Sequence, residues 1–137
     1  MMRLKILQAV MFMVCLNGCK SADKPIEREE IHESAIIRII PKRYDFGEAS
    51  AKKSTKIPFS FLIENVAQDT LRISKVDASC GCVHISTYPY EIVPGENGKI
   101  VGVIDIEGQN GYLNKAIFIS YNGDEITLVR VVGEVVE

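Results

Sequence analysis

The chain has 137 residues, of which 47% are hydrophobic, and this length and composition suit a single domain. Its 16 lysine and arginine residues nearly balance its 18 aspartate and glutamate residues, and they form no basic block. A nucleic-acid-binding surface therefore has no electrostatic support, and we do not expect one.

The N-terminal segment is similar to the export signal of bacterial lipoproteins. Arg3 and Lys5 form a positively charged start, and the apolar run that follows is too short to span a bilayer. The run leads into Leu-Asn-Gly-Cys at residues 16–19, which resembles the lipobox that precedes a lipid-carrying cysteine. This resemblance implies a signal peptide over residues 1–18 and a covalent lipid, including palmitate, on Cys19. An ordinary secretory peptide with an incidental Cys19 is the alternative.

Residues 19–34 are expected to form the lipidated cysteine and a polar tether. They are rich in charged residues, contain Pro25 and offer little apolar surface to bury. Treated as a flexible coil, a tether of this length spans roughly 20 Å, which holds a domain just clear of the lipid headgroups. We expect a protein of the cell envelope, anchored to the membrane through its lipid, at the periplasmic side of the outer membrane.

The remaining residues, 35–137, are expected to fold as one domain made of strands. No stretch in them shows sustained helical periodicity, and strand signals recur between turn signals. The clearest signal is at residues 57–63, where large apolar residues alternate with others. Because the Pro58 nitrogen has no hydrogen to donate, the beginning of this strand should lie at a sheet edge or point that nitrogen outward. Further strand signals are found at residues 35–40, 44–47, 71–76, 100–106, 113–119 and 126–135.

Several bends and turns can be placed from single residues. Val76 falls out of the alternation that precedes it, which predicts a bulge or bend just before the cysteines. The pair Pro94-Gly95 suits a type II turn, and Asn122-Gly123 is a strong hairpin signal. The last strand, residues 126–135, is apolar on both faces, so its register cannot be read from the pattern.

These strands predict an all-β domain, specifically an immunoglobulin-like antiparallel β-sandwich of about seven strands. We expect its two sheets to bury the apolar face of residues 59–63 against that of residues 100–106. The chain has no tryptophan and no widely spaced pair of cysteines, so it is not an antibody-type domain.

A series of short motifs runs from residue 44 to residue 135. The motifs are Asp45-Phe46-Gly47, Phe59-x-Phe61-x-x-x-Asn65, Leu71-x-Ile73, Ser79-Cys80-Gly81-Cys82, Pro94-Gly95-Glu96, Gly111 with Lys115 downstream, and Gly133-Glu134-Val135. In this order they resemble the bacterial family called domain of unknown function 1573 (DUF1573), Ig-like domains common in lipoproteins of Bacteroides-type bacteria. The resemblance implies a sandwich without an assigned reaction. The family usually has a glycine where this chain has Ala67, so we expect the hairpin after Asn65 to be built differently.

Cys80 and Cys82 are the two cysteines expected to remain as possible thiols, because Cys15 leaves with the signal peptide and Cys19 is lipidated. In an exported, oxidising compartment such thiols are normally buried, bonded to each other or metal-bound. On a straight strand, α-carbons two residues apart are separated by about 6.5–7 Å, near the outer limit for a disulfide. A bond between them therefore requires a bend, which Gly81 permits.

Three alternatives remain open for this pair. Both cysteines can be structural, as small half-buried residues or as a local disulfide. They can form a redox or partner-linking thiol site, because strained disulfides are comparatively easy to reduce. Cys80, Cys82 and His84 alternate onto one face and can bind Cu(I) or zinc, although three ligands do not close a structural zinc site. Alone, His84 is expected to be a half-buried strand residue.

No conventional catalytic arrangement is found in the sequence. Neither His32 nor His84 has an evident nucleophile and acid arranged around it, and no glycine-rich phosphate loop is present. We therefore predict a non-enzymatic interaction or envelope-assembly module with an envelope protein as its partner, no small-molecule substrate and no cofactor besides the lipid. A sheet edge that accepts a partner strand is one route to such binding. A thiol-redox or copper-handling lipoprotein is the alternative function.

Overall fold

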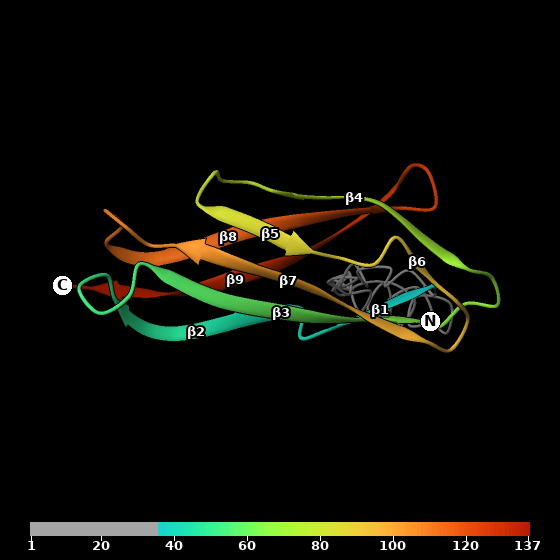
Figure 1. The fold of residues 1–137 in the computed structure, drawn as a ribbon, viewed down its shortest axis with the longest axis horizontal. Helices are drawn as coiled ribbons and strands as arrows, with labels where there is room; N and C mark the ends of the chain where they lie inside the picture. Colours follow the sequence, from blue (N-terminus) through green and yellow to red (C-terminus); the bar gives the residue numbers. More distant parts are fainter. Residues whose placement is uncertain (1–35) are drawn as a thin grey trace, which may run out of the picture. The chain divides into compact units, whose positions relative to one another are not determined.

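A computed structural model describes residues 36–137 of the chain (Figure 1). The predicted signal peptide, Cys19, the tether and Ala35 lie outside the described residues. Residues 36–137 form nine strands and no helix, and no membrane-crossing helix is therefore found among them. The strands are β1 (Ile37–Ile40), β2 (Arg43–Ser50), β3 (Lys56–Asn65), β4 (Leu71–Ala78), β5 (Val83–Thr87), β6 (Glu91–Ile92), β7 (Asn97–Asp105), β8 (Gly111–Tyr121) and β9 (Glu125–Val136).

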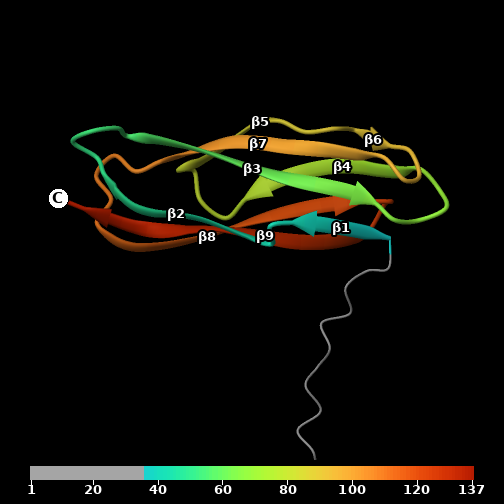
Figure 2. The same ribbon diagram turned by 90° about the horizontal axis from the view of Figure 1, so that it is seen from below.

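The strands form two sheets that lie face to face (Figure 2). The first sheet has the order β1-β3-β7-β5, and the second has the order β2-β9-β8-β4-β6. The C-terminus lies at the end of the sandwich opposite β1 (Figure 1). This arrangement confirms the predicted all-β, immunoglobulin-like sandwich. β5 and β6, which have only five and two residues, have no counterpart among the predicted strand segments, although His84 of β5 was expected to be a strand residue.

One pair of strands departs from the expected antiparallel arrangement. β2 runs parallel to β9, whereas the other paired strands are antiparallel. β1 and β2 are separated only by Pro41 and Lys42, yet they belong to different sheets. The two-residue link leaves the chain no room to reverse its direction as it changes sheets. β2 therefore continues in the direction of β1 and lies parallel to β9.

The core lies between the sheets and uses the predicted apolar faces. Phe59, Phe61 and Ile63 of β3 are buried, and so is the face of β7 that contains Ile100. The prediction that these two faces pack against each other across the core is wrong, because β3 and β7 are neighbours in one sheet, with Phe61 opposite Ile100. The buried side chains of the second sheet include Leu71, Ile73, Ile117, Ile119, Val129 and Val131.

The predicted irregularities of β3 and β4 are present. β1 pairs only with residues 62–65 of β3, so among the described strands none lies on that side of the segment that contains Pro58. The register of β4 against β8 shifts between Ile73 and Lys75. This shift is the bulge predicted from the position of Val76. It returns the Val76 side chain to the core.

The two predicted turns are also confirmed. Gly95 has a φ of +78° and the N–H of Glu96 donates to the Val93 carbonyl at 3.1 Å, as a type II turn requires. Asn122 and Gly123 have φ values of 47° and 94° and close the hairpin between β8 and β9.

Each free sheet edge carries a feature that opposes pairing with another strand. β1 has four residues and is followed by Pro41, and β5 has a register shift against β7. β2 is bulged at Gly47, which has a φ of +69°. β6 covers only the first two residues of β4, and the rest of that edge carries Lys75 and Asp77 as an ion pair. Short, bulged and charged edges resist the addition of a further strand.

Gly133 lies in β9 beneath the ring of Phe46, and a Cβ atom at this position would overlap the ring. This contact gives a physical reason for the occurrence of both residues among the motifs, although one lies near the start of the domain and the other near its end. Only glycine, which has no Cβ atom, lets the Phe46 ring approach the backbone of β9 this closely.

Gly133→Ala is therefore expected to lower the free energy of unfolding by about 1–3 kcal/mol, because the ring must shift. Equilibrium urea unfolding measures this change. Gly81→Ala is the matched control, since the space around a Cβ there is open, and its effect should stay within about 0.5 kcal/mol. Equal stability of the two variants would contradict the packing described.

Candidate functional site

Cys80 and Cys82 lie in the link that carries the chain from one sheet to the other. β4 of the second sheet ends at Ala78 and β5 of the first sheet begins at Val83. The two cysteines form a disulfide, and their α-carbons are 5.2 Å apart. The N–H of Val83 donates to the Cys80 carbonyl at 3.1 Å, which closes a turn around Gly81. The bend that a bond between these cysteines requires is therefore present.

Backbone hydrogen bonds hold this turn to both sheets. The N–H of Ser79 donates to the Ala116 carbonyl at 2.9 Å, and the N–H of Ala116 donates to Ser79 Oγ at 3.0 Å. On the other side, the N–H of Asp105 donates to the Cys82 carbonyl at 2.7 Å. The turn is thus tied to β8 before the disulfide and to β7 after it, so its position does not depend on the disulfide alone.

The two sulfurs have different surroundings. Both cysteines are half-buried, but Cys82 packs against the hydrophobic core. The N–H of Cys82 donates to Cys80 Sγ at 3.1 Å. The position between them, Gly81, is exposed and has open space above it. The disulfide therefore has one side toward the core and one side toward solvent.

His84 is exposed on β5, so the expectation of a half-buried residue is wrong. The cause is that β5 is an edge strand and turns this side chain to its outer face. Within residues 36–137 no group of three or more histidine, cysteine or acidic residues has the geometry to hold a metal ion. The geometry gives no support to a soft-metal site at Cys80, Cys82 and His84.

The outer face of the second sheet has a polar half and an apolar half. In the polar half, Arg43 Nη2 donates to the Tyr112 hydroxyl at 2.9 Å, which spans the sheet from β2 to β8. Arg130 Nη1 likewise donates to Asn114 Oδ1 at 3.0 Å. Val132 lies in β9 between these strands and is buried, although it belongs to the outer face.

In the apolar half no such bridge is present among the described contacts. Phe118 lies directly opposite Leu128, and Ile126 lies two residues before Leu128 in β9. Their exposed fractions are 39%, 44% and 65%. On one flank, Asp77 of β4 lies opposite Phe118 and pairs with Lys75. We call Phe118, Ile126 and Leu128 the β8–β9 patch.

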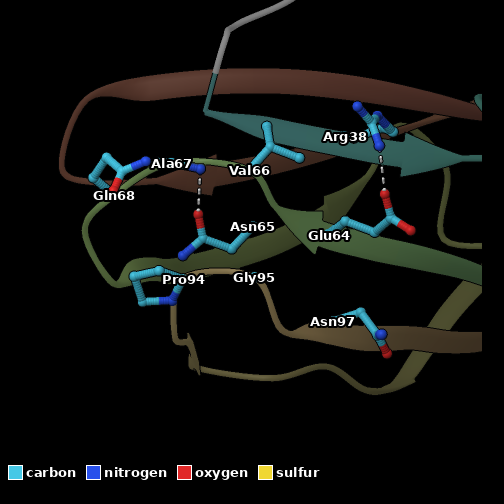
Figure 3. A pocket seen from close by; sticks show the side chains of 9 residues that line it. All are labelled: Arg38, Glu64, Asn65, Val66, Ala67, Gln68, Pro94, Gly95 and Asn97. Carbon is cyan, nitrogen blue, oxygen red and sulfur yellow. Dashed lines mark hydrogen bonds and ion pairs between the residues drawn. The ribbon is translucent and has the colours of Figure 1, made fainter.

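Asn65, at the end of β3, is the one buried polar residue in the described part of the chain, with 1% of its surface exposed. Its Nδ2 group donates to the carbonyl oxygens of Asp69 at 2.8 Å and Ile92 at 2.7 Å. Its Oδ1 atom accepts from the N–H of Ala67 at 3.0 Å (Figure 3). The side chain thus joins the turn between β3 and β4 to the end of β6.

The backbone of Asn65 adds two further bonds to the same segment. Its N–H donates to the Glu96 carbonyl, and its carbonyl accepts from the N–H of Gly95, both at 3.0 Å. We call these side-chain and backbone bonds the Asn65 clamp. Ala67, which stands where the family usually has a glycine, does not adopt positive φ, and its N–H is held by the asparagine side chain.

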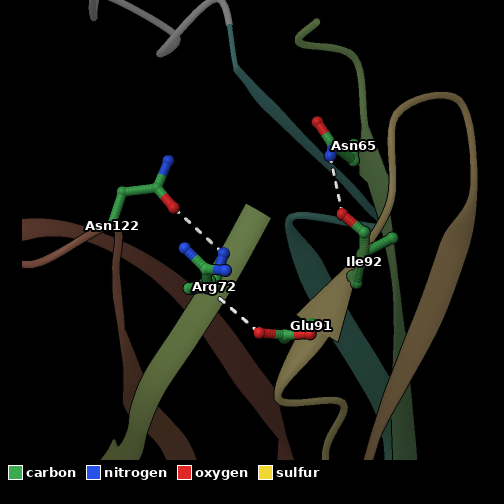
Figure 4. Close-up of polar contacts among 5 residues, drawn as sticks. All are labelled: Asn65, Arg72, Glu91, Ile92 and Asn122. Atoms are coloured by element: carbon green, nitrogen blue, oxygen red, sulfur yellow. Dashed lines mark hydrogen bonds and ion pairs between the residues drawn. The ribbon is translucent and has the colours of Figure 1, made fainter. Parts of the chain in front are cut away.

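A second asparagine joins strands near the clamp. The N–H of Arg72 donates to Asn122 Oδ1 at 2.9 Å, and the N–H of Asn122 donates to the Arg72 carbonyl at 2.8 Å (Figure 4). Arg72 Nε also bonds Glu91 Oε1 at 3.0 Å. These contacts tie the β8–β9 hairpin to β4 and β6.

An open depression lies on the surface beside the clamp (Figure 3). Its walls come from the turns around Ala67 and Pro94 and from the ion pair of Arg38 with Glu64, whose charged atoms are 3.0 Å apart. Arg38 and Glu64 are paired with each other and the Asn65 side chain is hydrogen-bonded within the clamp, which leaves Gln68 and Asn97 as the other polar side chains that line the depression.

Residues 37–135 match the profile of the family described as "Protein of unknown function (DUF1573)". The chain belongs to the DUF1573 family. The match covers all nine strands except the last residue of β9, and it confirms the family suggested by the motifs. No protein of the curated collection that was searched is similar to the chain.

Solved structures similar to this DUF1573 domain share its fold. A protein of unknown function from Porphyromonas gingivalis W83 has a TM-score of 0.61 and 19% identity, covering 72% of this chain and 46% of its own. The Vibrio cholerae VesB protease has a TM-score of 0.57 and 13% identity, covering 72% and 32%. The ASH / PapD-like domain 7 of human CEP192 has a TM-score of 0.57 and 9% identity, covering 75% and 87%.

This DUF1573 chain thus spans less than half the length of the first two proteins. At such low identities the likeness shows the fold alone. Because one similar structure belongs to a protease, the fold does not decide whether the chain is an enzyme, and its non-enzymatic character stays a prediction.

Several DUF1573 motif residues have structural positions that sequence reasoning did not assign. The Asp45 Oδ1 atom accepts from the N–H of Gly47 at 2.9 Å, which closes the bulge of β2. Gly111 begins β8 with a φ of +77°. The motif that contains Asn65 and the motif Pro94-Gly95-Glu96 meet in the clamp. The polar character of Asn65 at the end of an otherwise apolar strand was the signal that could have revealed this contact.

Asn65→Asp is expected to lower the free energy of unfolding by about 2–4 kcal/mol near neutral pH, because a carboxylate has no donor for the Asp69 and Ile92 carbonyls. Protonation restores one donor, so the loss should be smaller near pH 4 than near pH 7. Urea unfolding at both pH values measures this. Asn97→Asp is the matched control, since Asn97 is exposed in the same depression. Equal effects of the two substitutions would contradict the clamp.

Proposed function

We propose that this DUF1573 protein is a lipid-anchored, extracytoplasmic module that binds a protein of the cell envelope and catalyses no reaction. The observation that carries the proposal is the β8–β9 patch, where three large apolar side chains lie together on the outer face of a sheet. Single exposed apolar residues are ordinary, but residues gathered in this way commonly mark a protein-binding surface.

Binding through this face agrees with the construction of the sheet edges. The free edges of the sandwich are short, bulged or charged, which opposes the addition of a partner strand. The β8–β9 patch has no such protection, whereas the polar half of the same face is covered by the bridges from Arg43 and Arg130. We therefore place the partner on the face of the second sheet rather than at an edge.

The surroundings of the patch indicate the chemistry of the partner. Lys75 pairs with Asp77 on one flank, and Arg130 bonds Asn114 toward the polar half. The nearby charges are thus already engaged, and the patch itself is apolar. A partner that buries it needs a cluster of apolar side chains surrounded by polar groups, which is the usual organisation of a protein interface.

The membrane anchor rests on the sequence of the first 34 residues. The lipobox-like residues 16–19 support lipid attachment at Cys19, and the charged residues that follow suit a tether. A disulfide between Cys80 and Cys82 fits an oxidising, exported location. We therefore propose the periplasmic side of the outer membrane as the location. There the tether holds the domain near the membrane, and the β8–β9 patch is available to other envelope proteins.

The double substitution Phe118→Ser and Leu128→Ser is expected to reduce recovery of a cross-linked envelope partner by at least about tenfold, because central apolar residues dominate interface affinity. The measurement is quantitative mass spectrometry of proteins captured with the full-length chain after cross-linking in intact cells. Val93→Ser is the matched control, since Val93 is 53% exposed but lies in the turn before β7. Unchanged recovery with the double variant, or no specific partner of the wild type, would count against the proposal.

Cys19→Ala is expected to abolish incorporation of labelled palmitate, because the acylated sulfur is removed. Cys15→Ala is the control and should be labelled as the wild type is, since residue 15 lies within the predicted signal peptide. Palmitate that persists in the Cys19→Ala protein would show that the anchor is elsewhere.

A further inference from the structure

We propose that Cys80 and Cys82 form a thiol–disulfide exchange site, in which Cys80 makes a mixed disulfide with a thiol of another exported protein and Cys82 is the sulfur displaced when that bond forms. This activity goes beyond the binding role proposed above and does not depend on the β8–β9 patch. It rests on three features of the turn: the access to each sulfur, the hydrogen bond to one of them, and the attachment of the turn to both sheets.

Access distinguishes the two sulfurs. Cys82 is among the half-buried residues that pack against the core, whereas Cys80 is not. Gly81 between them has no atom within 4 Å of a Cβ position, so the space above the turn is open. The rate of exchange depends on which sulfur an incoming thiolate can reach. Attack therefore falls on Cys80 Sγ.

A hydrogen bond distinguishes them further. The N–H of Cys82 donates to Cys80 Sγ at 3.1 Å, and a backbone N–H stabilises a thiolate more than a neutral sulfur. The donor stays in place when the sulfur–sulfur bond opens, because Ser79 and Cys82 are held by backbone bonds to Ala116 and Asp105. Access to Cys80 therefore decides the first step, and in the second step this N–H makes Cys80 the better leaving group of the mixed disulfide.

The exchange proceeds in two steps with a substrate that carries two thiols. One substrate thiolate attacks Cys80 Sγ; a substrate–Cys80 bond forms, and the Cys80–Cys82 bond breaks with its electron pair on Cys82, which takes up a proton. The second substrate thiolate then attacks the substrate sulfur of the mixed disulfide. A substrate disulfide forms, Cys80 leaves as a thiolate beside the Cys82 N–H, and two electrons have passed from the substrate to the pair.

If the second thiolate does not attack, Cys82 attacks Cys80 Sγ, restores the original disulfide and releases the substrate. The open turn offers a small molecule few contacts. The substrate class is therefore a protein that brings two cysteines to the turn on its own surface.

The first test locates the adduct. The oxidised full-length protein is mixed with excess reduced glutathione as the probe, quenched with acid and N-ethylmaleimide, and mapped by peptide mass spectrometry. The expected result is glutathione on Cys80 and maleimide on Cys82, in at least about tenfold excess over the reverse pattern. A ratio near one, the reverse pattern, or a disulfide that resists the thiol would overturn the assignment.

The second test compares the two single variants after reaction with oxidised glutathione. Cys82→Ser, which keeps Cys80, should form its adduct at least about tenfold faster than Cys80→Ser, which keeps Cys82. Thermal unfolding of both variants shows whether each is folded. Equal rates in folded variants would assign the pair a structural role alone.

The third test identifies the substrate. In cells, the Cys80 thiolate of Cys82→Ser should attack the disulfide of an oxidised substrate; a substrate–Cys80 bond forms, the substrate disulfide breaks and its second sulfur leaves as a thiolate. These mixed disulfides should persist until a reductant releases them, because Cys82 is no longer present to displace the substrate, whereas Cys80→Ser should retain none. Adducts with small thiols alone would overturn the protein substrate. Phe118→Ser with Leu128→Ser should leave the glutathione chemistry unchanged, so failure of the proposed binding role and failure of the exchange site give different results.

Discussion

Asn65 donates two hydrogen bonds to carbonyl groups of different segments, Asp69 and Ile92, in a place that solvent does not reach. A buried carbonyl without a partner costs about 1–3 kcal/mol, so these bonds decide whether the turns around Asn65 can be covered at all. The same residue takes part in the ladder with β1, where it lies opposite Ile37. One residue, through its side chain and its backbone, thus holds together the first strand of the domain, the turn after β3 and the turn before β7.

This arrangement leaves the other parts of the molecule free to differ in chemistry. The clamp and the bonds of Asn122 close one end with polar contacts that are internally satisfied. The turn at Cys80 is attached separately, by hydrogen bonds to β8 and β7, and carries a half-buried disulfide. The β8–β9 patch adds an apolar surface to a face that is otherwise bridged by arginine side chains. Structural and candidate functional residues therefore occupy different places on the sandwich.

Much of the fold could be predicted from sequence because local rules govern it. Alternation revealed the buried face of β3, the displaced parity of Val76 revealed a bulge, and Asn122-Gly123 revealed a hairpin. Strand neighbours could not be predicted, because the pairing of β3 with β7 and of β2 with β9 joins residues far apart in the chain. The exposure of His84 was missed for the same reason, since it depends on β5 being an edge strand.

The candidate sites show the same limit. The spacing of Cys80 and Cys82 located an unusual pair, but only the structure shows that one sulfur packs toward the core and the other accepts a hydrogen bond. The sequence showed that Asn65 belongs to a motif, but its hydrogen-bond partners come from turns that meet only in the folded chain.

Hydrogen exchange of the Asn65 side-chain NH₂ group, measured by nuclear magnetic resonance, tests the Asn65 clamp most directly. Exchange as slow as that of core backbone amides is predicted, and exchange at the rate of an exposed asparagine would contradict the clamp.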